Sequence, residues 1–211
     1  VTGVQTCALP ISELSHFTGV GDAVALVIPD HAGGFDHRTM AAELQQTHPG
    51  LRHVLVDGDP GPFTAWSDIA ECAQKSAGSG VATDRPALLL VSGGTTGFPK
   101  LIPRTHDDYI YNATASARLC GLSADDVYLV ALPAAHNFPL ACPGLLGAMS
   151  VGATTVFTTD PSPESAFATI NRHGVTVTAL VPALAKLWAQ ACQWEPQVPT
   201  TLRLLQVGGA K

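Results

Sequence analysis

The chain has 211 residues, of which 46% are hydrophobic and 13% are charged, and its formal net charge is −6. This composition predicts a globular protein with a well-buried core and excludes disorder for the chain as a whole. Only 11 residues are Lys or Arg, too few for a basic stripe, so we expect no nucleic-acid partner. No apolar run reaches the roughly 18 residues of a membrane-spanning helix, so we expect no membrane partner either.

Five cysteines stand at positions 7, 72, 120, 142 and 192, with no C-x-x-C pair and no His/Cys spacing suited to zinc. We therefore expect neither a disulfide framework nor a metal site. This cysteine usage suits a reducing compartment, and we expect the protein in the cytoplasm.

Residues 1–12 lack the basic region and apolar core of a signal peptide. They look like translated sequencing-adapter sequence, so we expect a non-native segment and set it aside from fold reasoning. The alternative is a genuine leading helix and loop.

Short apolar runs bounded by Gly, Pro or Asp predict strands buried on both faces. They lie at 23–28, 53–56, 87–91, 127–131, 154–157, 175–180 and 202–207. Helical stretches are predicted between them at 36–47, 64–75, 105–119, 140–150, 162–173 and 182–194. This alternation predicts an α/β fold with a mainly parallel sheet. The Gly/Ser-rich stretch 76–85 is the expected hinge, which divides a first α/β portion at 13–85 from a second at 86–211.

A loop rich in glycine and hydroxyl groups directly follows the predicted strand at 87–91. It contains Ser92, Gly93, Gly94, Thr95, Thr96 and Gly97, followed by Phe98, Pro99 and Lys100. Glycines let backbone N–H groups approach an anion, and the lysine adds positive charge, so we predict a polyphosphate site. The spacing departs from a Walker A loop, because two residues separate the last glycine from the lysine and Leu101 follows it. The alternative is an ordinary flexible turn.

A second segment, 132–144, follows the predicted strand at 127–131. In an open α/β sheet, ligands bind beyond the carboxyl ends of the strands. Phe138 and Leu140 offer apolar walls for a small aromatic guest, and His136 and Asn137 offer polar groups to orient it. The alternative is that these polar residues are only solvated or structural.

The order Ser-Gly-Gly-Thr-Thr-Gly-Phe-Pro-Lys at 92–100 resembles the signature loop of the adenylate-forming (AMP-binding) superfamily. The order Ala-His-Asn-Phe-Pro-Leu-Ala-Cys-Pro-Gly at 135–144 resembles a motif of its aryl-acid branch, the 2,3-dihydroxybenzoate- and salicylate-AMP ligases of siderophore biosynthesis. Further likeness to this branch lies at 29–36, 51–56, 103–109 and 206–211.

The resemblance implies that ATP and an aryl acid give aryl-AMP and pyrophosphate. The aryl group then passes to the phosphopantetheine thiol of an aryl carrier protein. Residues 92–97 would hold the ATP phosphates, and Lys100 would neutralise the departing pyrophosphate. His136 would lie near the carboxylate, and Asn137 would bond the ring's ortho hydroxyl.

The resemblance also assigns Phe138 and the segment Gly208, Gly209, Ala210 and Lys211 to the aryl acid, with the two glycines as a flat pocket wall. Mg²⁺ would be a cofactor, with its ligands outside this chain. The two α/β portions would belong to one AMP-binding domain, truncated at its C-terminus. Lys211 is therefore not taken as the catalytic lysine of the family's small C-terminal domain.

Cys142 bears on the choice of acid, because the matching residue in the family is typically Ser for 2,3-dihydroxybenzoate and Cys for salicylate. A buried Ser finds a partner in the 3-hydroxyl, whereas Cys behaves as a small hydrophobe. We favour salicylate, with 2,3-dihydroxybenzoate as the second acid, and the alternative is that Cys142 only packs at a helix start. An aryl- or acyl-CoA ligase and an inactive, binding-only fragment remain the alternative functions.

Overall fold

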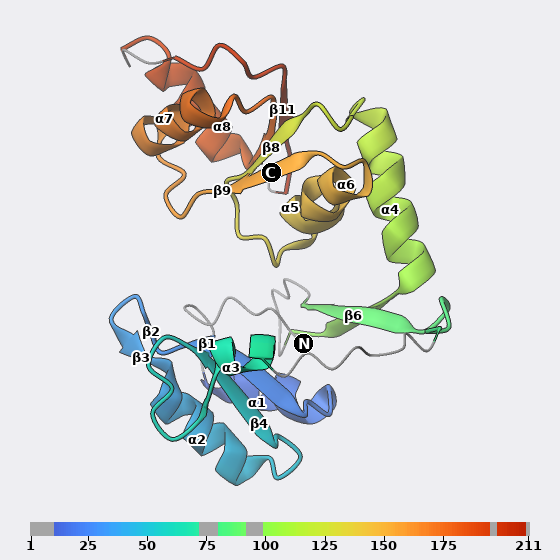
Figure 1. The fold of residues 1–211 in the computed structure, drawn as a ribbon, viewed down its shortest axis with the longest axis vertical. Helices are drawn as coiled ribbons and strands as arrows, with labels where there is room; N and C mark the ends of the chain where they lie inside the picture. Colours follow the sequence, from blue (N-terminus) through green and yellow to red (C-terminus); the bar gives the residue numbers. More distant parts are fainter. Residues whose placement is uncertain (1–10, 72–79, 92–98, 195–197, 210–211) are drawn as a thin grey trace. The chain divides into compact units, whose positions relative to one another are not determined.

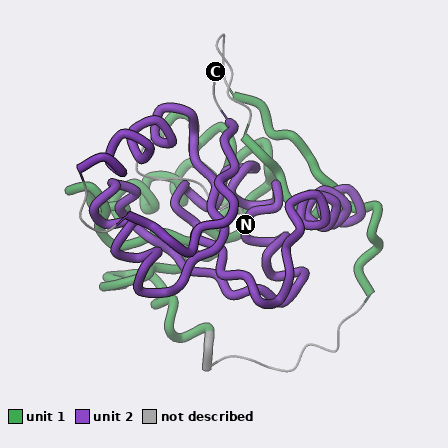
Figure 2. Tube along the Cα trace, turned by 90° about the horizontal axis from the view of Figure 1, so that it is seen from above, with its two compact units in different colours: residues 1–105 green, residues 106–211 purple. Residues whose placement is uncertain are grey.

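A computed structural model describes residues 11–71, 80–91, 99–194 and 198–209. The chain divides into two compact units, residues 1–105 and 106–211, which Figure 2 colours separately. No helix in the described part of the chain is long and apolar enough to cross a membrane.

The first unit alternates short strands with helices (Figure 1). In chain order its elements are α1 (Ile11–Val20), β1 (Ala25–Pro29), β2 (His31–Ala32), β3 (Phe35–Asp36), α2 (His37–Thr47), β4 (His53–Asp57), β5 (Thr64–Ala65), α3 (Trp66–Glu71), β6 (Pro86–Val91) and β7 (Leu101–Thr105). Strands β1, β4 and β5 form a parallel sheet. Strands β2 and β3 form one antiparallel pair, and β6 and β7 form another.

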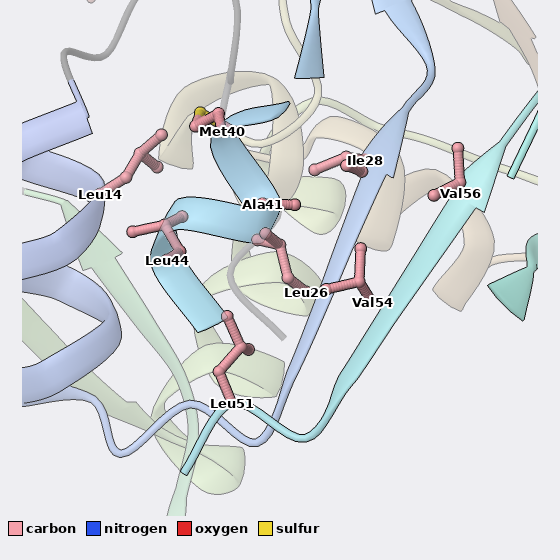
Figure 3. Packing of buried hydrophobic residues seen from close by; sticks show 9 residues of the cluster. All are labelled: Leu14, Leu26, Ile28, Met40, Ala41, Leu44, Leu51, Val54 and Val56. Atoms are coloured by element: carbon pink, nitrogen blue, oxygen red, sulfur yellow. The ribbon is translucent and has the colours of Figure 1, made fainter. Parts of the chain in front are cut away.

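The core of the first unit lies between its parallel sheet and the helices α1 and α2 (Figure 3). Alternate residues of β1 and β4 are buried, as expected where side chains point to opposite faces of a strand. Helix α2 contributes Met40 and Ala41 together with Leu44, which lies four and three positions further along and so on the same helical face, and α1 contributes Leu14. The cluster comprises Leu14, Leu26, Ile28, Met40, Ala41, Leu44, Leu51, Val54 and Val56.

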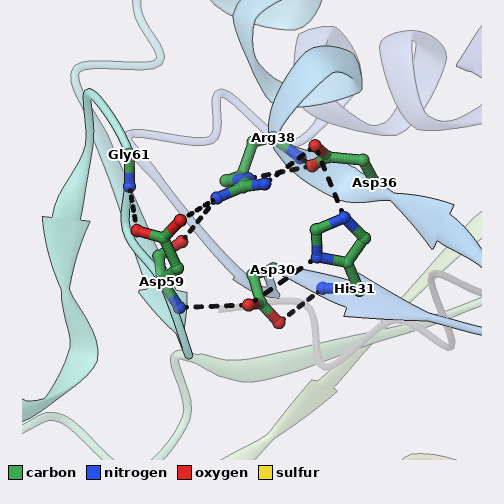
Figure 4. Close-up of polar contacts among 6 residues, drawn as sticks. All are labelled: Asp30, His31, Asp36, Arg38, Asp59 and Gly61. Atoms are coloured by element: carbon green, nitrogen blue, oxygen red, sulfur yellow. Dashed lines mark hydrogen bonds and ion pairs between the residues drawn. The ribbon is translucent and has the colours of Figure 1, made fainter.

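A charged network ties the start of α2 to the loop after β4 (Figure 4). Asp36 caps α2 by accepting a hydrogen bond from the backbone N–H of Arg38 at 3.0 Å. The Arg38 guanidinium also lies 2.9 Å from the carboxylate of Asp36 and 2.7 Å from that of Asp59. These contacts with Arg38 lower the pKa of Asp36 to about 2. Asp30 accepts a hydrogen bond from the Asp59 backbone N–H at 3.1 Å, so the network also reaches the end of β1.

The second unit is a four-stranded parallel sheet with helices on both faces. Its elements are α4 (His106–Leu119), β8 (Val127–Val130), α5 (Asn137–Ala141), α6 (Gly144–Ser150), β9 (Thr154–Phe157), α7 (Pro163–His173), β10 (Val177–Leu180), α8 (Pro182–Ala191) and β11 (Leu204–Val207). The strand order is β11-β10-β8-β9, and all three pairings are parallel. All four residues of β10 are buried, as expected for an inner strand covered on both faces.

Two hydrophobic clusters cover the two faces of this sheet. On one face, Phe167 of α7 meets Trp188 of α8 edge to face at 5.4 Å, next to Leu129 and Leu180 of the sheet. The other face carries Tyr128, Val130, Val177 and Ala179, which pack with Ala117 of α4 and Ala148 of α6. The candidate pocket residues described below belong to this second face.

An ion pair holds the amino-terminal edge of the sheet. The buried carboxylate of Asp126, just before β8, lies 2.7 Å from a guanidinium nitrogen of Arg203, just before β11. Thr176, just before β10, donates its hydroxyl to Asp126 at 2.7 Å. Asp126 therefore links the starts of three strands, and its hydrogen bonds with Arg203 hold the pKa of its carboxyl well below the usual range.

The expected α/β fold with mainly parallel strands is confirmed, and a strand is present at each of the seven expected runs. The expected burial on both faces is complete for β10, but only alternate residues of β1 and β4 are buried and β6 contains no buried residue, so that expectation is wrong for these three strands. The single helix expected at 140–150 is wrong, because α5 ends at Ala141 and α6 begins at Gly144. Pro143 has no N–H to continue the first helix, and Gly144 adopts a left-handed φ of +55°. A Cβ on Gly144 would also collide with the carbonyl of Pro139.

Three further expectations concern segments that the structure describes only in part. Of the helix expected at 64–75, residues 66–71 form α3, Thr64 and Ala65 form strand β5 instead, and residues 72–79 lie outside the described part. Residues 76–79 of the expected hinge at 76–85 also lie outside the described part. Residues 1–10 of the expected non-native segment also lie outside it, whereas Ile11 and Ser12 begin α1.

Replacing Asp126 with Asn in the full-length protein should lower the free energy of unfolding at pH 7 by about 2 kcal/mol, because a buried, charge-assisted hydrogen-bond network loses its acceptor. Since the pKa of Asp126 is depressed in the folded state, the carboxylate contributes its full stability above about pH 4 and loses it as the pH falls toward the folded-state value. In urea unfolding, the difference in the free energy of unfolding between wild type and Asp126→Asn should therefore become smaller as the pH falls from about 4 to about 3.

The matched control is Asp125→Asn, the same change at an exposed neighbour. An equal loss of stability in both variants would contradict the role given to Asp126.

Candidate functional site

The predicted phosphate loop joins two paired strands. Val91, the last residue of β6, is the register partner of Leu101, the first residue of β7. Residues 92–100 connect these two register partners. Of the predicted phosphate-binding residues, 92–97 lie outside the described part, and Lys100 is described just before β7. The phosphate contacts thus stay predictions.

The predicted aryl segment follows the carboxyl end of β8. His136 is exposed at the start of α5, and its carbonyl oxygen accepts the backbone N–H of Leu140 at 2.9 Å. This short helix brings Asn137 and Phe138 onto the same unit as Cys142, which follows α5 directly. Four predicted site residues therefore lie on α5 or directly beside it, namely His136, Asn137, Phe138 and Cys142.

Asn137 is oriented by two neighbours. Its Oδ1 accepts a hydrogen bond from the hydroxyl of Tyr109 on α4 at 3.1 Å. Its Nδ2 lies 3.5 Å from the sulfur of Cys142 and donates toward it. With the Tyr109 hydroxyl donating to the amide oxygen, the amide nitrogen of Asn137 is the end that faces Cys142. One N–H of the Asn137 amide then serves Cys142, and the second is a donor available to a ligand.

Cys142 is held by amide side chains from two other elements. Asn112 of α4 donates from Nδ2 to the Cys142 sulfur at 3.3 Å and to the Ala141 carbonyl at 2.9 Å. Gln206 of β11 donates from Nε2 to the Cys142 carbonyl at 3.2 Å. The thiol and the backbone of this residue are therefore both fixed by hydrogen bonds.

The ring of Phe138 lies against the residues that follow β11. Gly208 continues the strand pairing, because its N–H donates to the Leu180 carbonyl at 3.1 Å. A Cβ at Gly208 would lie 3.3 Å from Cζ of Phe138, tighter than ordinary packing allows. Gly209 has a φ of +82°, a conformation that favours glycine, and a Cβ there would lie 3.5 Å from the same ring. The two glycines thus let the backbone approach Phe138, while Ala210 and Lys211 lie outside the described residues.

Two polar atoms are buried on the same face of the sheet as this cluster. The Tyr128 hydroxyl and Oε1 of Gln206 have no hydrogen-bond partner within the described structure. Burial raises the pKa of Tyr128 well above its usual value, so this hydroxyl stays protonated. Burial likewise raises the pKa of Cys120, whose sulfur accepts a hydrogen bond from Gln206 at 3.3 Å.

The structure thus brings together Asn137, Phe138, Cys142, Gly208 and Gly209 within the second unit. Sequence reasoning missed three residues that hold them in place, namely Tyr109, Asn112 and Gln206. The first two lie on α4 with helical spacing, and Gln206 lies inside a strand, so a pattern of elements gives no sign of a site role. The described residues contain no group of three His, Cys, Asp or Glu side chains that could hold a metal ion.

Tyr109→Phe should lower the free energy of unfolding by about 1 kcal/mol, because Oδ1 of Asn137 loses its donor. Tyr128→Phe should leave it unchanged or raise it, because that substitution removes a buried hydroxyl that has no partner in the described structure. Tyr111, 73% exposed on the same helix, supplies the control Tyr111→Phe. Urea unfolding of the full-length variants checks this order, and equal values for Tyr109→Phe and Tyr111→Phe would refute the orienting contact.

Two curated relatives match nearly the whole chain. The salicyl-AMP ligase / salicyl-S-ArCP synthetase of Mycobacterium tuberculosis (strain ATCC 25618 / H37Rv) is 70% identical over 203 residues, covering 95% of this chain and 36% of that protein. The 2,3-dihydroxybenzoate-AMP ligase of Bacillus subtilis (strain 168) is 44% identical over 200 residues, covering 95% of this chain and 37% of that protein. This chain therefore spans a little over a third of the length of either relative.

The fold matches a solved structure and a family model. The apo structure of Mycobacterium smegmatis MbtA is 66% identical with a TM-score of 0.87, over 97% of this chain and 37% of that one. A model of the family described as AMP-binding enzyme matches residues 6–211. Because that match covers nearly all of its residues, the chain belongs to the AMP-binding enzyme family.

Proposed function

We propose that this chain carries the aryl-acid pocket and the phosphate loop of an aryl-acid AMP ligase that acts on salicylate. A carboxylate oxygen of the acid attacks the α-phosphorus of ATP, the bond between the α-phosphorus and the bridging oxygen breaks, and pyrophosphate leaves. The single observation that carries the proposal is the 70% identity to a salicyl-AMP ligase across 95% of the chain.

The geometry around Asn137 supports an aryl acid as the guest. One amide N–H of Asn137 is directed at Cys142, and the other is a donor for an ortho hydroxyl. Phe138 and the backbone of Gly208 and Gly209 add apolar and flat surfaces nearby. A pocket with apolar walls and a few fixed polar groups suits a small aromatic ligand.

Two other residues, Lys100 and His136, are assigned to the phosphates of ATP and the carboxylate of the acid. Lys100 would neutralise charge on the leaving pyrophosphate, together with the N–H groups and hydroxyls of residues 92–97. His136, exposed at the start of α5, would lie near the carboxylate and the α-phosphate. Ala210 and Lys211 would continue the aryl-binding segment after Gly209.

Salicylate is favoured over 2,3-dihydroxybenzoate because of Cys142. A thiol is a weak hydrogen-bond donor, so it compensates poorly for the water that a 3-hydroxyl loses on entering the pocket. A serine at this position would supply a full hydroxyl partner. The second acid is therefore expected to react more slowly rather than to be rejected outright.

The product would next be consumed by a thiol. The phosphopantetheine sulfur of an aryl carrier protein attacks the carbonyl carbon of aryl-AMP, the bond to the AMP oxygen breaks, and AMP leaves. The carrier protein is thus the proposed partner, siderophore biosynthesis the proposed role, and the cytoplasm the proposed compartment. Mg²⁺ stays an expectation from the resemblance, with its ligands expected outside this chain, and no step here passes through it.

The proposal is tested by exchange of labelled pyrophosphate into ATP, catalysed by the full-length protein. Salicylate should support exchange with a kcat/KM about tenfold above that of 2,3-dihydroxybenzoate, since one buried hydroxyl lacks a full partner. Benzoate, which has no ortho hydroxyl for Asn137, serves as the control acid and should be slower than salicylate.

Faster exchange with 2,3-dihydroxybenzoate would contradict the choice of acid, and no exchange with any aryl acid would contradict the proposed function. A second assay separates the acceptors by offering the preformed aryl-AMP either free CoA or the phosphopantetheinylated carrier domain. Transfer to CoA alone would contradict the proposed partner.

A further inference from the structure

Asn112 lies on helix α4, outside both segments that carry the predicted aryl pocket. It is partly buried, and both hydrogens of its amide nitrogen are used. One is donated to the carbonyl oxygen of Ala141 at 2.9 Å and the other to the sulfur of Cys142 at 3.3 Å. Asn112 therefore holds the last carbonyl of α5 and the adjacent thiol at the same time.

The sulfur of Cys142 receives a second amide donor from Asn137, at 3.5 Å. That amide is held in place by Tyr109, which donates to its oxygen. With two N–H groups directed at it, the sulfur acts as a hydrogen-bond acceptor toward the protein. The thiol then has only its weak S–H donor to offer to a ligand.

We propose that Asn112 is a positioning residue that biases the pocket toward an aryl acid with a single ortho hydroxyl. This inference rests on the proposed function and names a residue that sets its substrate preference. A second ring hydroxyl placed against Cys142 needs an acceptor for its proton. The sulfur already accepts N–H groups from Asn112 and Asn137, and Asn112 takes one lone pair of the Ala141 carbonyl, so that hydroxyl would compete for these acceptors and regain only part of the hydrogen bonding it loses from water.

Removing the Asn112 amide takes one donor away from the Ala141 carbonyl and one from the sulfur, to which Asn137 still donates. A 3-hydroxyl could then donate to the thiol sulfur or to the Ala141 carbonyl, and the penalty against 2,3-dihydroxybenzoate should fall. Salicylate, which has no group at that position, gains nothing from this change. The ratio of the two kcat/KM values, rather than either value alone, is therefore the quantity that Asn112 controls.

The test measures this ratio, salicylate over 2,3-dihydroxybenzoate, by pyrophosphate exchange in the full-length wild-type protein and in the variants N112A and N112D. Asp has the shape of Asn but no N–H to donate, so it removes the hydrogen bonds and keeps the volume. Both variants should lower the ratio about fivefold, the change expected for one ordinary hydrogen bond.

The matched control is N171A, the same substitution at an exposed residue of α7, a helix that packs on the other face of the sheet. Its ratio should equal that of wild type. A double-mutant cycle with Cys142→Ser measures how far the effect of N112A on the ratio depends on the thiol. A merely structural role for Asn112 predicts no such dependence. If Asn112 acts through the thiol, N112A should change the ratio less when the Ser hydroxyl already offers the 3-hydroxyl a partner.

The outcomes separate this inference from the function on which it rests. If the wild-type protein adenylates neither acid, the proposed function is wrong and the inference falls with it. If the wild-type protein is active but both variants keep its ratio, only the inference is overturned. It is also overturned if N112D keeps the ratio while N112A lowers it, because volume would then be the cause. Thermal unfolding checks the variants, and failure of both to fold would make Asn112 a structural residue and refute the inference.

Discussion

The parallel register of β8, β10 and β11 is the constraint on which the candidate site depends. In parallel strands the carboxyl ends meet at one edge, so the loop after β8 and the residues after β11 emerge at the same edge, with β10 between the two strands. The N–H of Gly208 extends the pairing with Leu180 by one more hydrogen bond. This is what brings Gly208 against the ring of Phe138, although 70 positions separate them in the sequence. At the opposite edge, Asp126 links the starts of the same strands.

Helix α4 supplies the second layer of this arrangement. It packs on the sheet through Ala117, and from the same helix Tyr109 reaches the start of α5 while Asn112 reaches its end and the following Cys142. The turn between α5 and α6 depends on Gly144, whose left-handed backbone favours glycine and whose Cβ position is occupied by the carbonyl of Pro139. Side chains from α4 and a strand therefore fix a loop that short helices alone would leave poorly defined. A binding pocket needs such support, because its polar groups must stay oriented when no ligand is present.

The sequence predicted the parallel strands well because each is a short apolar run with clear Gly, Pro or Asp boundaries. It did not reveal β7, since Pro103 within that strand lacks an N–H and weakens the signal. Helix α1 was also missed: its Leu14 and Phe17 are buried, yet the first predicted element began at residue 23. The break at Pro143 was overlooked because the apolar pattern on both sides is continuous.

Some residues of the candidate site were predicted from the sequence, and others were found only in the structure. Motif resemblance pointed to Asn137, Phe138 and Cys142, which the fold brings together with Gly208. Resemblance and periodicity were both silent on Asn112, because a polar residue on a helix is ordinarily a solvent-facing one. Only the three-dimensional contacts give this amide its two acceptors. The predicted phosphate contacts of residues 92–97 stay predictions.

The proposed function requires that the turn after β8 and the end of β11 together form an aryl-acid pocket. A crystal structure of the full-length protein with a non-hydrolysable analogue of salicyl adenylate would test this directly. We expect the ortho hydroxyl within hydrogen-bonding distance of Nδ2 of Asn137, with the aryl ring in contact with Cys142 and the backbone of Gly208. An aryl ring bound out of reach of all three residues would show that the pocket lies elsewhere.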